Sequence, residues 1–359
     1  MRGMKKASEL VGATPSAQVR PVSLALRRAV ATFDALAPSL PIVVGCSGGA
    51  DSLALATCLI DAGSRAGHDV YTITVDHGIR PESTAEAEEV VRKLTWLGAD
   101  KAVREQVQVG SAGGPEAAAR DARYEGLARA AAELSAAGAP IWLGHTLDDQ
   151  AEGVLLSLAR GSGTHSLAGM RQGFEGGHVH SRIRPLLGLR RADTEACCNG
   201  LGLQYVVDPS NKADGPWKTA DGQALRRAAL RERALPALAQ ALGKDAAPAL
   251  AKSALLARQD DEALEAMAQT ILAEVATDED GQILLQANAL ASHLPALRRR
   301  VLRLAGARVG LTELTATHLQ ALDALVSNWH GQGPVDLPAG QALREAKTGR
   351  MWLRATSER

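Results

Sequence analysis

Apolar runs alternate with helical patterns over the first two hundred residues of this chain, and this alternation constrains its fold more than any other feature. Strand character falls at 42–46, 71–75, 106–109, 140–143 and 204–207. Helical patterns lie between these runs, at 52–62, 84–97, 116–135 and 148–159. Such a chain folds into a parallel sheet covered by helices on both faces. We therefore predict an α/β fold with a doubly wound parallel sheet, which binds ligands at the carboxyl ends of its strands.

The turn after the first apolar run has the chemistry of a pyrophosphate-binding loop. It reads Ser47-Gly48-Gly49-Ala50-Asp51-Ser52. Successive glycines let backbone N–H groups approach an anion closely, and the helix that follows points its positive end at the same place. Both serine hydroxyls can donate to phosphate, whereas Asp51 suits a metal or an acid–base role. An ordinary corner in which Asp51 or Ser52 only caps the helix is the alternative, but the serines and the aspartate around Gly-Gly favour nucleotide binding.

Polar residues also follow two other predicted strands. Asp76 and His77 come after the second run, where they can meet adenine or ribose, although a plain strand-end turn explains this segment taken alone. After the fourth run, Gly144-His145 leads into a helix on which His145, Asp149 and Glu152 share one side. A capping box with Thr146 explains only Asp149. The cluster can bind Mg²⁺, or one carboxylate can hold a cationic substrate.

Composition limits the remaining possibilities. The 359 residues suggest two or three domains, and the net charge of +0 means that a polyanionic partner would have to meet a local basic patch. The four cysteines, which form no C-x-x-C, argue against a disulfide framework and fit a reducing cytoplasm. The sequence contains neither a run long enough for a membrane span nor the apolar block of a signal peptide. We therefore predict a cytoplasmic protein with no membrane association.

Three regions follow from the pattern along the chain. Residues 1–22 read as a disordered extension in which Met4 is an alternative start, and 23–215 as the ATP-binding catalytic domain. The polar segment 211–223 reads as a linker. Residues 216–359 read as a mainly helical domain that ends in a hairpin formed by 335–337 and 351–353.

The hexapeptide Ser47–Ser52 resembles the PP-loop of the N-type ATP pyrophosphatases, which split ATP into AMP and pyrophosphate in order to adenylate a substrate. It differs from the G-x-x-x-x-G-K-[ST] P-loop, which the chain lacks. The resemblance implies a Rossmann-like PP-loop ATPase domain, with ATP as cofactor and reaction at its α-phosphate.

A longer series of motifs lies between about Val43 and Pro236. In order, the motifs are Ser47–Ser52, Asp76-His77-Gly78, Arg120 with Arg123-Tyr124, Gly144-His145 with Asp148-Asp149-Gln150-Ala151-Glu152, Arg160-Gly161-Ser162-Gly163, Gly169-Met170, Arg184-Pro185-Leu186 and Asp208-Pro209-Ser210-Asn211. Within that superfamily, this series is similar to the tRNA(Ile)-lysidine synthetase family. The resemblance implies a ligase that adenylates C2 of the wobble cytidine in the CAU anticodon of tRNA(Ile). Free L-lysine then displaces AMP, and no obligatory protein partner is evident.

The family resemblance also implies roles for individual residues. Asp149 corresponds to the acid that contacts lysine, His145 positions or deprotonates a reactant, and Arg120 holds phosphate oxygens or the carboxylate of lysine. Asp51 is the candidate catalytic ligand of Mg²⁺. The implied ATP site comprises Ser47, Gly48, Gly49, Asp51, Ser52, Asp76, His77 and Gly144, and the implied tRNA contacts are Arg184, Arg227 and Arg231.

Two further observations concern tRNA binding. Ala229 stands where the family usually carries an arginine, while Arg227 and Arg231 remain. Residues 171–233 carry a net charge of +4 despite the neutral whole, and a second basic run is Arg298-Arg299-Arg300 with Arg303 and Arg308. Solvated helix faces explain such runs, but their position favours contacts to phosphates.

Three alternatives remain at this point. A tRNA thiolase of the same superfamily is disfavoured because the chain lacks C-x-x-C. An ATP amidotransferase would need a glutamine-hydrolysing domain or partner, and none is visible. A nucleotide-responsive RNA-binding protein that has lost catalysis is hinted at by Ala229 alone.

Overall fold

A computed structural model describes residues 5–78, 82–110, 115–161, 163–209, 212–215, 217–219, 222–311 and 313–356. The motif residues Ser162, Ser210 and Asn211 lie outside these ranges. Backbone contacts divide the chain into two compact units, Met1–Leu255 and Leu256–Arg359. This division falls later in the chain than the predicted one at 215/216, because the residues after the polar segment pack within the first unit.

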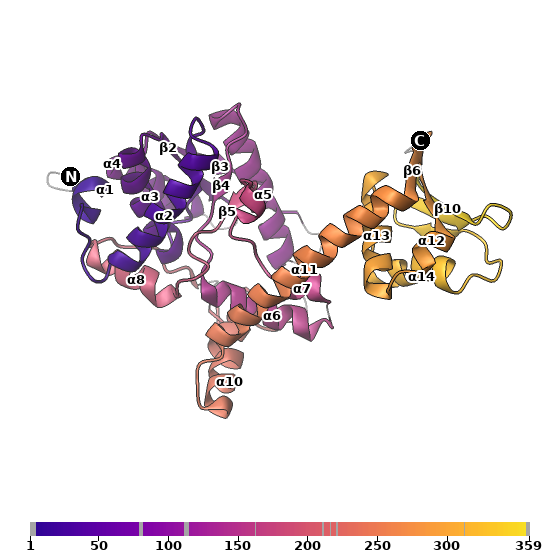
Figure 1. The fold of residues 1–359 in the computed structure, drawn as a ribbon. Coiled ribbons are helices and arrows are strands. Elements are labelled where there is room, and N and C mark those ends of the chain that lie inside the picture. The colour runs from indigo at the N-terminus through magenta and orange to yellow at the C-terminus, as the bar shows by residue number, and fades with distance from the viewer. Residues whose placement is uncertain are drawn as a thin grey trace. The chain divides into compact units, whose positions relative to one another are not determined.

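The first unit is built on a five-stranded parallel sheet with the order β3-β2-β1-β4-β5 (Figure 1). The order reverses direction between β1 and β4, and a sheet of this kind binds ligands at such a switch point. The predicted doubly wound parallel sheet is therefore confirmed. Its strands are β1 (Ile42–Gly45), β2 (Val70–Asp76), β3 (Lys101–Gln106), β4 (Ile141–Trp142) and β5 (Arg182–Ile183).

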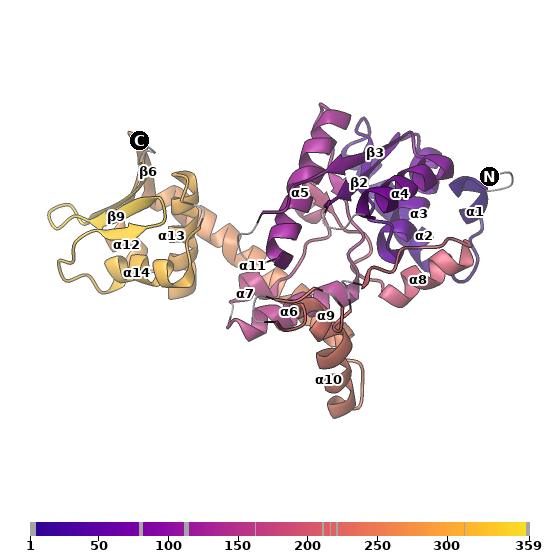
Figure 2. The same cartoon turned by 180° about the vertical axis from the view of Figure 1, so that it is seen from behind.

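Helices cover both faces of this sheet because successive strand residues point in opposite directions. Ile42 and Val44 pack into the core shared with α2, α3, α4 and α8, whereas Val43 and Ile73 pack against α5. Figure 2 shows α5 on one side of the sheet and α2, α3 and α4 on the other. The helices of this unit up to that point are α1 (Ala7–Val11), α2 (Arg20–Leu36), α3 (Ala50–Ala66), α4 (Ser83–Leu97), α5 (Pro115–Leu134), α6 (Leu147–Ala159), α7 (Thr164–Leu167), the 3₁₀ turn η1 (Glu175–Gly177) and α8 (Arg191–Gly200).

Two predicted strands lie elsewhere. The third is Lys101–Gln106 rather than 106–109, because four of the six residues of this edge strand are charged or polar and it forms no apolar run. The fifth is the two-residue β5, whereas 204–207, all within the described residues, is extended without sheet pairing. There the Val206 N–H donates to the carbonyl of Gly48 at 2.9 Å, so this apolar segment packs against the glycine turn.

The predicted disordered extension also differs from the structure. Within residues 5–22, α1 forms and α2 begins, and Ala7, Val11 and Val19 are buried in the main core. Their side chains belong to the same hydrophobic core as the buried residues of α2 and α3. Burial of this apolar surface offsets the entropy cost of ordering the segment.

The first unit continues past the polar segment, part of which lies outside the described residues. Helices follow in close succession: α9 (Arg226–Ala229), the π-helical turn η3 (Leu230–Ala234), α10 (Leu235–Leu242) and α11 (Ala247–Val275), which extends into the second unit.

The second unit combines helices with a five-stranded antiparallel sheet of order β6-β7-β10-β9-β8. The predicted terminal hairpin is therefore wrong in its pairing, since 335–337 pairs with β9 and 351–353 lies in β10, which pairs with β7 and β9. Its elements are β6 (Ala276–Glu279), β7 (Gln282–Gln286), α12 (Ala287–Ala291), α13 (Pro295–Arg308), α14 (Ala316–Ser327), β8 (Val335–Leu337), β9 (Gly340–Arg344) and β10 (Arg350–Ala355). They enclose a hydrophobic core of their own.

Candidate active site

The glycine turn joins β1 to α3 and is shaped by its own hydroxyl groups. Ser52 Oγ accepts a hydrogen bond from the Ser47 N–H at 3.1 Å and donates to the Gly49 carbonyl at 3.1 Å. Gly48 has φ +84°, and a Cβ there would come within 2.5 Å of Val90 Cγ2. Only glycine fits this position. The result is a tight turn with the exposed Ser47 at its edge.

A second glycine brings the end of β4 against the same turn. A Cβ on Gly144 would lie 2.9 Å from the backbone carbon and oxygen of Asp51. Its hydrogen therefore permits a backbone approach that any side chain would prevent. Gly144 thus acts on the predicted ATP site by allowing β4 and α3 to meet.

The first two turns of α6 carry Asp148, Asp149 and Glu152, which are called the acidic cluster below. The backbone N–H and hydroxyl of Thr146 both donate to Asp149 Oδ2, at 2.8 and 2.9 Å, and form the capping box that the sequence offered as an alternative. The other carboxylate oxygen, Asp149 Oδ1, faces a guanidinium. Asp149 therefore caps the helix and also takes part in the cluster.

Arg191, at the start of α8, joins three of the predicted acidic residues. Its guanidinium lies 3.3 Å from Asp51 Oδ2, 3.0 Å from Asp149 Oδ1 and 3.7 Å from Glu152 Oε1. Thr194, one turn further along α8, donates its hydroxyl to Asp51. Sequence reasoning missed both residues, because 191–200 shows no clear helical pattern and Arg191 was noted only as part of a basic segment.

Burial raises the pKa of a carboxyl group and ion pairing lowers it, and both act on the carboxyl groups of this site. Burial raises the pKa of Asp51 above its usual value, although Thr194 and Arg191 act to lower it. Burial also raises the pKa of Glu152, against Arg231. At Asp149 the opposing contributions of Arg191, His145 and Thr146 outweigh burial and lower the pKa. Asp149 is therefore the carboxylate of this group held most firmly in its charged form.

His145 immediately precedes the capping box and is buried beside it. Burial, with Arg184, Arg123 and Arg120 nearby, holds the pKa of His145 well below its usual value despite the attraction of Asp149. Its Nδ1 atom is buried without a hydrogen-bond partner among the described residues. A neutral imidazole at this place, with one N–H donor and one acceptor nitrogen, can position a reactant by hydrogen bonds.

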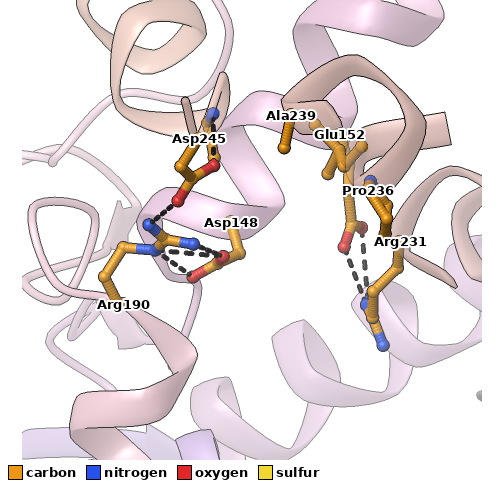
Figure 3. A pocket seen from close by; sticks show the side chains of 9 residues that line it. Asp148, Glu152, Arg190, Arg231, Pro236, Ala239 and Asp245 are labelled. Atoms are coloured by element: carbon orange, nitrogen blue, oxygen red, sulfur yellow. Dashed lines mark hydrogen bonds and ion pairs between the residues drawn. The ribbon is translucent and has the colours of Figure 1, made fainter. Parts of the chain in front are cut away.

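A cavity of about 210 Å³ opens beside the acidic cluster (Figure 3). On one side Arg190 donates from Nη2 to Asp148 Oδ1 at 2.8 Å and from Nε to Asp148 Oδ2 at 3.2 Å, and it forms a further pair with Asp245. On the other side Arg231 Nε lies 2.8 Å from Glu152 Oε1. Leu235, Pro236, Ala239 and Ala247 complete the apolar part of the lining.

Two arginines predicted to contact tRNA thus meet the acidic cluster. Arg231 pairs with Glu152, and Arg227 Nη1 lies 3.8 Å from the same carboxylate. Arg231 belongs to the π-helical turn η3, and such turns are frequent at functional sites. The third predicted tRNA contact, Arg184, is buried and donates to the Arg171 carbonyl at 3.1 Å. Arg120 lies over the ring of Tyr124 on α5.

Asp76 and His77 lie at the end of β2. The Asp76 side chain is fully buried and accepts from Gly78 N–H, Ser83, Thr84 and Arg104, at 2.8 to 2.9 Å. It thereby joins the end of β2 to Gly78 and to the start of α4. His77 is partly exposed, and burial together with Arg123 lowers its pKa. Their assignment to ATP stays a prediction.

The second basic run is neutralised within its own unit. Arg298 and Arg299 pair with Asp323 at 2.7 and 3.4 Å, and Arg300 pairs with Asp261 at 2.6 Å. Arg303 and Arg308 pair with Glu265 and Asp278. These arginines stabilise the fold of the second unit, and their charge is largely offset there.

No set of three His, Cys, Asp or Glu side chains is arranged to hold a metal ion within the described ranges. Mg²⁺ nevertheless needs only one or two carboxylates when phosphate oxygens complete its shell. Asp51, beside the glycine turn, fits that requirement. No helix in the described part of the chain has the length and apolar character needed to cross a bilayer.

Comparison with known proteins agrees with this geometry. A profile described as the PP-loop domain matches residues 24–238, and one described as the TilS substrate binding domain matches 285–348. The U34-tRNA thiolase NcsA from Methanococcus maripaludis, solved with its [4Fe-4S] cluster, shares the fold with a TM-score of 0.50 at 18% identity, covering 72% of this chain and 84% of its own. The fold and the glycine turn define a PP-loop protein.

Similarity to individual proteins identifies the family within this class. The tRNA(Ile)-lysidine synthase of Leifsonia xyli is 42% identical over 311 residues, 86% of this chain and 89% of that protein. That of Streptomyces coelicolor is 43% identical over 324 residues, 89% and 87% of the two chains. The chain belongs to the tRNA(Ile)-lysidine synthase family, as its motifs predict.

Proposed function

We propose that this protein is an ATP-dependent ligase that converts the wobble cytidine in the CAU anticodon of tRNA(Ile) to lysidine, with free L-lysine as the second substrate and AMP and pyrophosphate as products. One observation carries the proposal. The Arg191 guanidinium bridges Asp51 of the glycine turn and Asp149 of the acidic cluster. A phosphate-binding turn and a cation-binding carboxylate therefore lie within the span of one side chain.

ATP binds at the turn Ser47–Ser52, beside the positive end of α3. Asp51 would hold Mg²⁺, and the bound ion would neutralise charge on the leaving pyrophosphate. Gly48 and Gly144 keep the space around the turn free of side chains. The cytidine O2 attacks the α-phosphate, and the base then carries AMP at that oxygen.

Lysine binds with its ε-amine near Asp149, whose ionised form is favoured by its surroundings. Because Arg191 contacts Asp149 Oδ1 in the present structure, the lysine ammonium and this guanidinium compete for one carboxylate. Glu152 provides a second carboxylate one helical turn away. The neutral His145 orients the amine that attacks C2 and releases AMP.

Arg120 holds phosphate or the carboxylate of lysine, and Arg184, Arg227 and Arg231 serve the tRNA. The ion pair between Arg231 and Glu152 supports a location of the target base beside the acidic cluster. Ala229 precedes η3 directly, and its small side chain leaves Arg227 and Arg231 as the arginines of this segment that face Glu152.

The decisive experiment measures AMP release by purified protein given Mg-ATP, L-lysine and a CAU-anticodon tRNA(Ile) transcript, followed by nucleoside analysis of the RNA. We expect AMP in proportion to lysidine, and no lysidine when lysine is omitted or when the anticodon cytidine is replaced. A protein that binds ATP and this tRNA but releases no AMP would refute the proposed catalysis and favour an RNA-binding role. AMP release with a different modified base would instead identify another substrate.

A further inference from the structure

Three guanidinium groups converge on one aromatic ring at the carboxyl end of the parallel sheet. The centroid of the Tyr124 ring lies 4.3 Å from the guanidinium of Arg182, 5.0 Å from that of Arg120 and 5.2 Å from that of Arg123. Against the effect of burial, Arg184, next to β5, lies close enough to help lower the pKa of Tyr124. Cation–π attraction to the ring partly offsets the repulsion between these like charges. This group of four arginines is called the Tyr124 cluster below.

No carboxylate within the described residues forms an ion pair with any arginine of the Tyr124 cluster. Burial lowers the pKa of the Arg120 guanidinium, and the charges of Arg227, Arg123 and Arg182 lower it further, against the effect of Tyr124. This contrasts with Arg190, Arg191 and Arg231, each of which meets a carboxylate at 3.0 Å or less. Positive charge is thus concentrated here without a counter-charge from the described part of the protein.

Buried donors in the Tyr124 cluster also lack acceptors. Arg123 Nε and Arg184 Nε are shielded from solvent and form no hydrogen bond within the described residues. An unpartnered buried donor costs free energy, so its persistence calls for a ligand or another acceptor. Arg182, in contrast, is exposed, so the cluster remains open to solvent.

We propose that the Tyr124 cluster is an oxyanion site that takes a phosphate group, and that in the working enzyme this group is a backbone phosphodiester of the RNA next to the target base. Planar guanidinium groups match phosphate oxygens in pairs. The exposed Arg182 leaves room for a strand that continues in both directions, as a phosphodiester requires. The RNA assignment rests on the proposed function. The phosphates of ATP have the same chemistry and are the other source.

Arg182→Gln tests this site, because Arg182 is exposed and its loss leaves the core intact. The matched control is Arg129→Gln, which removes the same charge from an exposed side chain on α5 that pairs with Glu105. A second variant, Arg182→Lys, retains the charge but not the planar fork. Binding of tRNA(Ile) transcript is measured against KCl concentration, and ATP and pyrophosphate binding are measured in parallel without RNA.

We expect Arg182→Gln to weaken RNA binding roughly tenfold and to reduce the slope of log K against log[salt] by about 0.7, the contribution of one single-strand phosphate. Arg182→Lys should keep the slope, and Arg129→Gln should match the wild type. Weaker ATP or pyrophosphate binding with unchanged RNA binding would support the oxyanion site but assign it to the nucleotide. Unchanged binding of RNA, ATP and pyrophosphate would overturn it.

These outcomes are separable from those of the proposed function. If the wild type forms lysidine and Arg182→Gln behaves as the wild type in every binding assay, the site is wrong and the function stands. If the wild type binds RNA without forming lysidine, the salt slopes still decide the site.

Discussion

Arg191 places one positive charge among three carboxylates, in the region where two cations, Mg²⁺ and the lysine ammonium, are expected. Asp51 is the candidate ligand of Mg²⁺, and Asp149 is the candidate partner of the lysine ammonium; both contact this guanidinium. A buried carboxylate left without a cation would be costly. We therefore expect Arg191 to act as an internal counter-ion for Asp51 and Asp149 until a bound cation replaces it.

Replacement of Arg191 by Gln should change the pH dependence of lysine use. Arg191 is the main charged group that lowers the pKa of Asp149, so its loss raises that pKa and lets the carboxylate protonate at a higher pH. We expect the acidic limb of the kcat/KM profile for lysine to move up by about one pH unit. Arg190→Gln, the control, removes the neighbouring charge that pairs with Asp148 and Asp245. Identical profiles for Arg191→Gln and the wild type would contradict this role.

Replacement of Asp149 by Asn should separate lysine binding from ATP binding. Asn keeps an acceptor for the Thr146 cap but loses the charge that attracts an ammonium. The KM for lysine should rise by roughly 100-fold, since a charge-assisted contact is lost from a buried site. The affinity for ATP, measured by calorimetry, should change little. A parallel loss of ATP affinity would show that Asp149 does not act on lysine in particular.

Asp76 allows a test of its structural role through pH. Burial raises its pKa, but bonds from Gly78, Thr84, Ser83 and Arg104 outweigh burial and lower the pKa to about 2. A lowered folded-state pKa contributes stability that is present above the ordinary value near 4 and is lost as the pH falls through about 2. Asp76→Asn should therefore reduce the free energy of unfolding at pH 6 by about 2 kcal/mol, and by much less near pH 2. Urea denaturation at both pH values measures this, and an equal loss at both would contradict it.

At the scale of elements, the sequence predicted the parts whose signals are local. The apolar run of β1, the glycine turn and the helices α3, α4, α5 and α6 lie where the sequence predicts them. Edge strand β3 and the two-residue β5 lack such signals because edge position and shortness remove the apolar run. The helix α8 was missed because its buried face carries Thr194, Cys197 and Cys198 rather than large apolar residues, and Arg191 was missed with it. Sequence therefore identified the acids of the site but not the cation that joins them.

Gly144 offers a test of how β4 and α3 meet. In Gly144→Ala the new Cβ would lie 2.9 Å from backbone atoms of Asp51, which cannot turn away as a side chain does. We expect a loss of about 1–3 kcal/mol in the free energy of unfolding and a higher KM for ATP. Gly153→Ala, inside α6 with nothing within 4 Å of the new Cβ, should increase the free energy of unfolding by about 0.5–1 kcal/mol. An unchanged KM for ATP in Gly144→Ala would show that this contact does not shape the turn.

At the scale of the whole molecule, each of the two units has its own hydrophobic core and its own set of ion pairs. The first unit holds the glycine turn, the acidic cluster and the Tyr124 cluster, around the cores that cover its parallel sheet. The second unit has a separate core, and its basic run is neutralised by its own acids. The PP-loop and TilS profiles each match residues within one unit. Catalytic chemistry and the stability of the second unit should therefore respond to different substitutions.

Leu322→Ala tests this division. Leu322 lies on α14, fully buried in the core of the second unit, and truncation of such a leucine typically costs about 2–5 kcal/mol. We expect calorimetry to show a lower melting temperature for one transition, and tRNA affinity to fall at temperatures where that unit unfolds. ATP affinity should be unchanged, because the glycine turn belongs to the other core. The reciprocal variant Leu53→Ala, fully buried beside the turn on α3, should lower ATP affinity and the other transition. If Leu322→Ala weakened ATP binding at temperatures where the first unit stays folded, the two units would not be energetically separate.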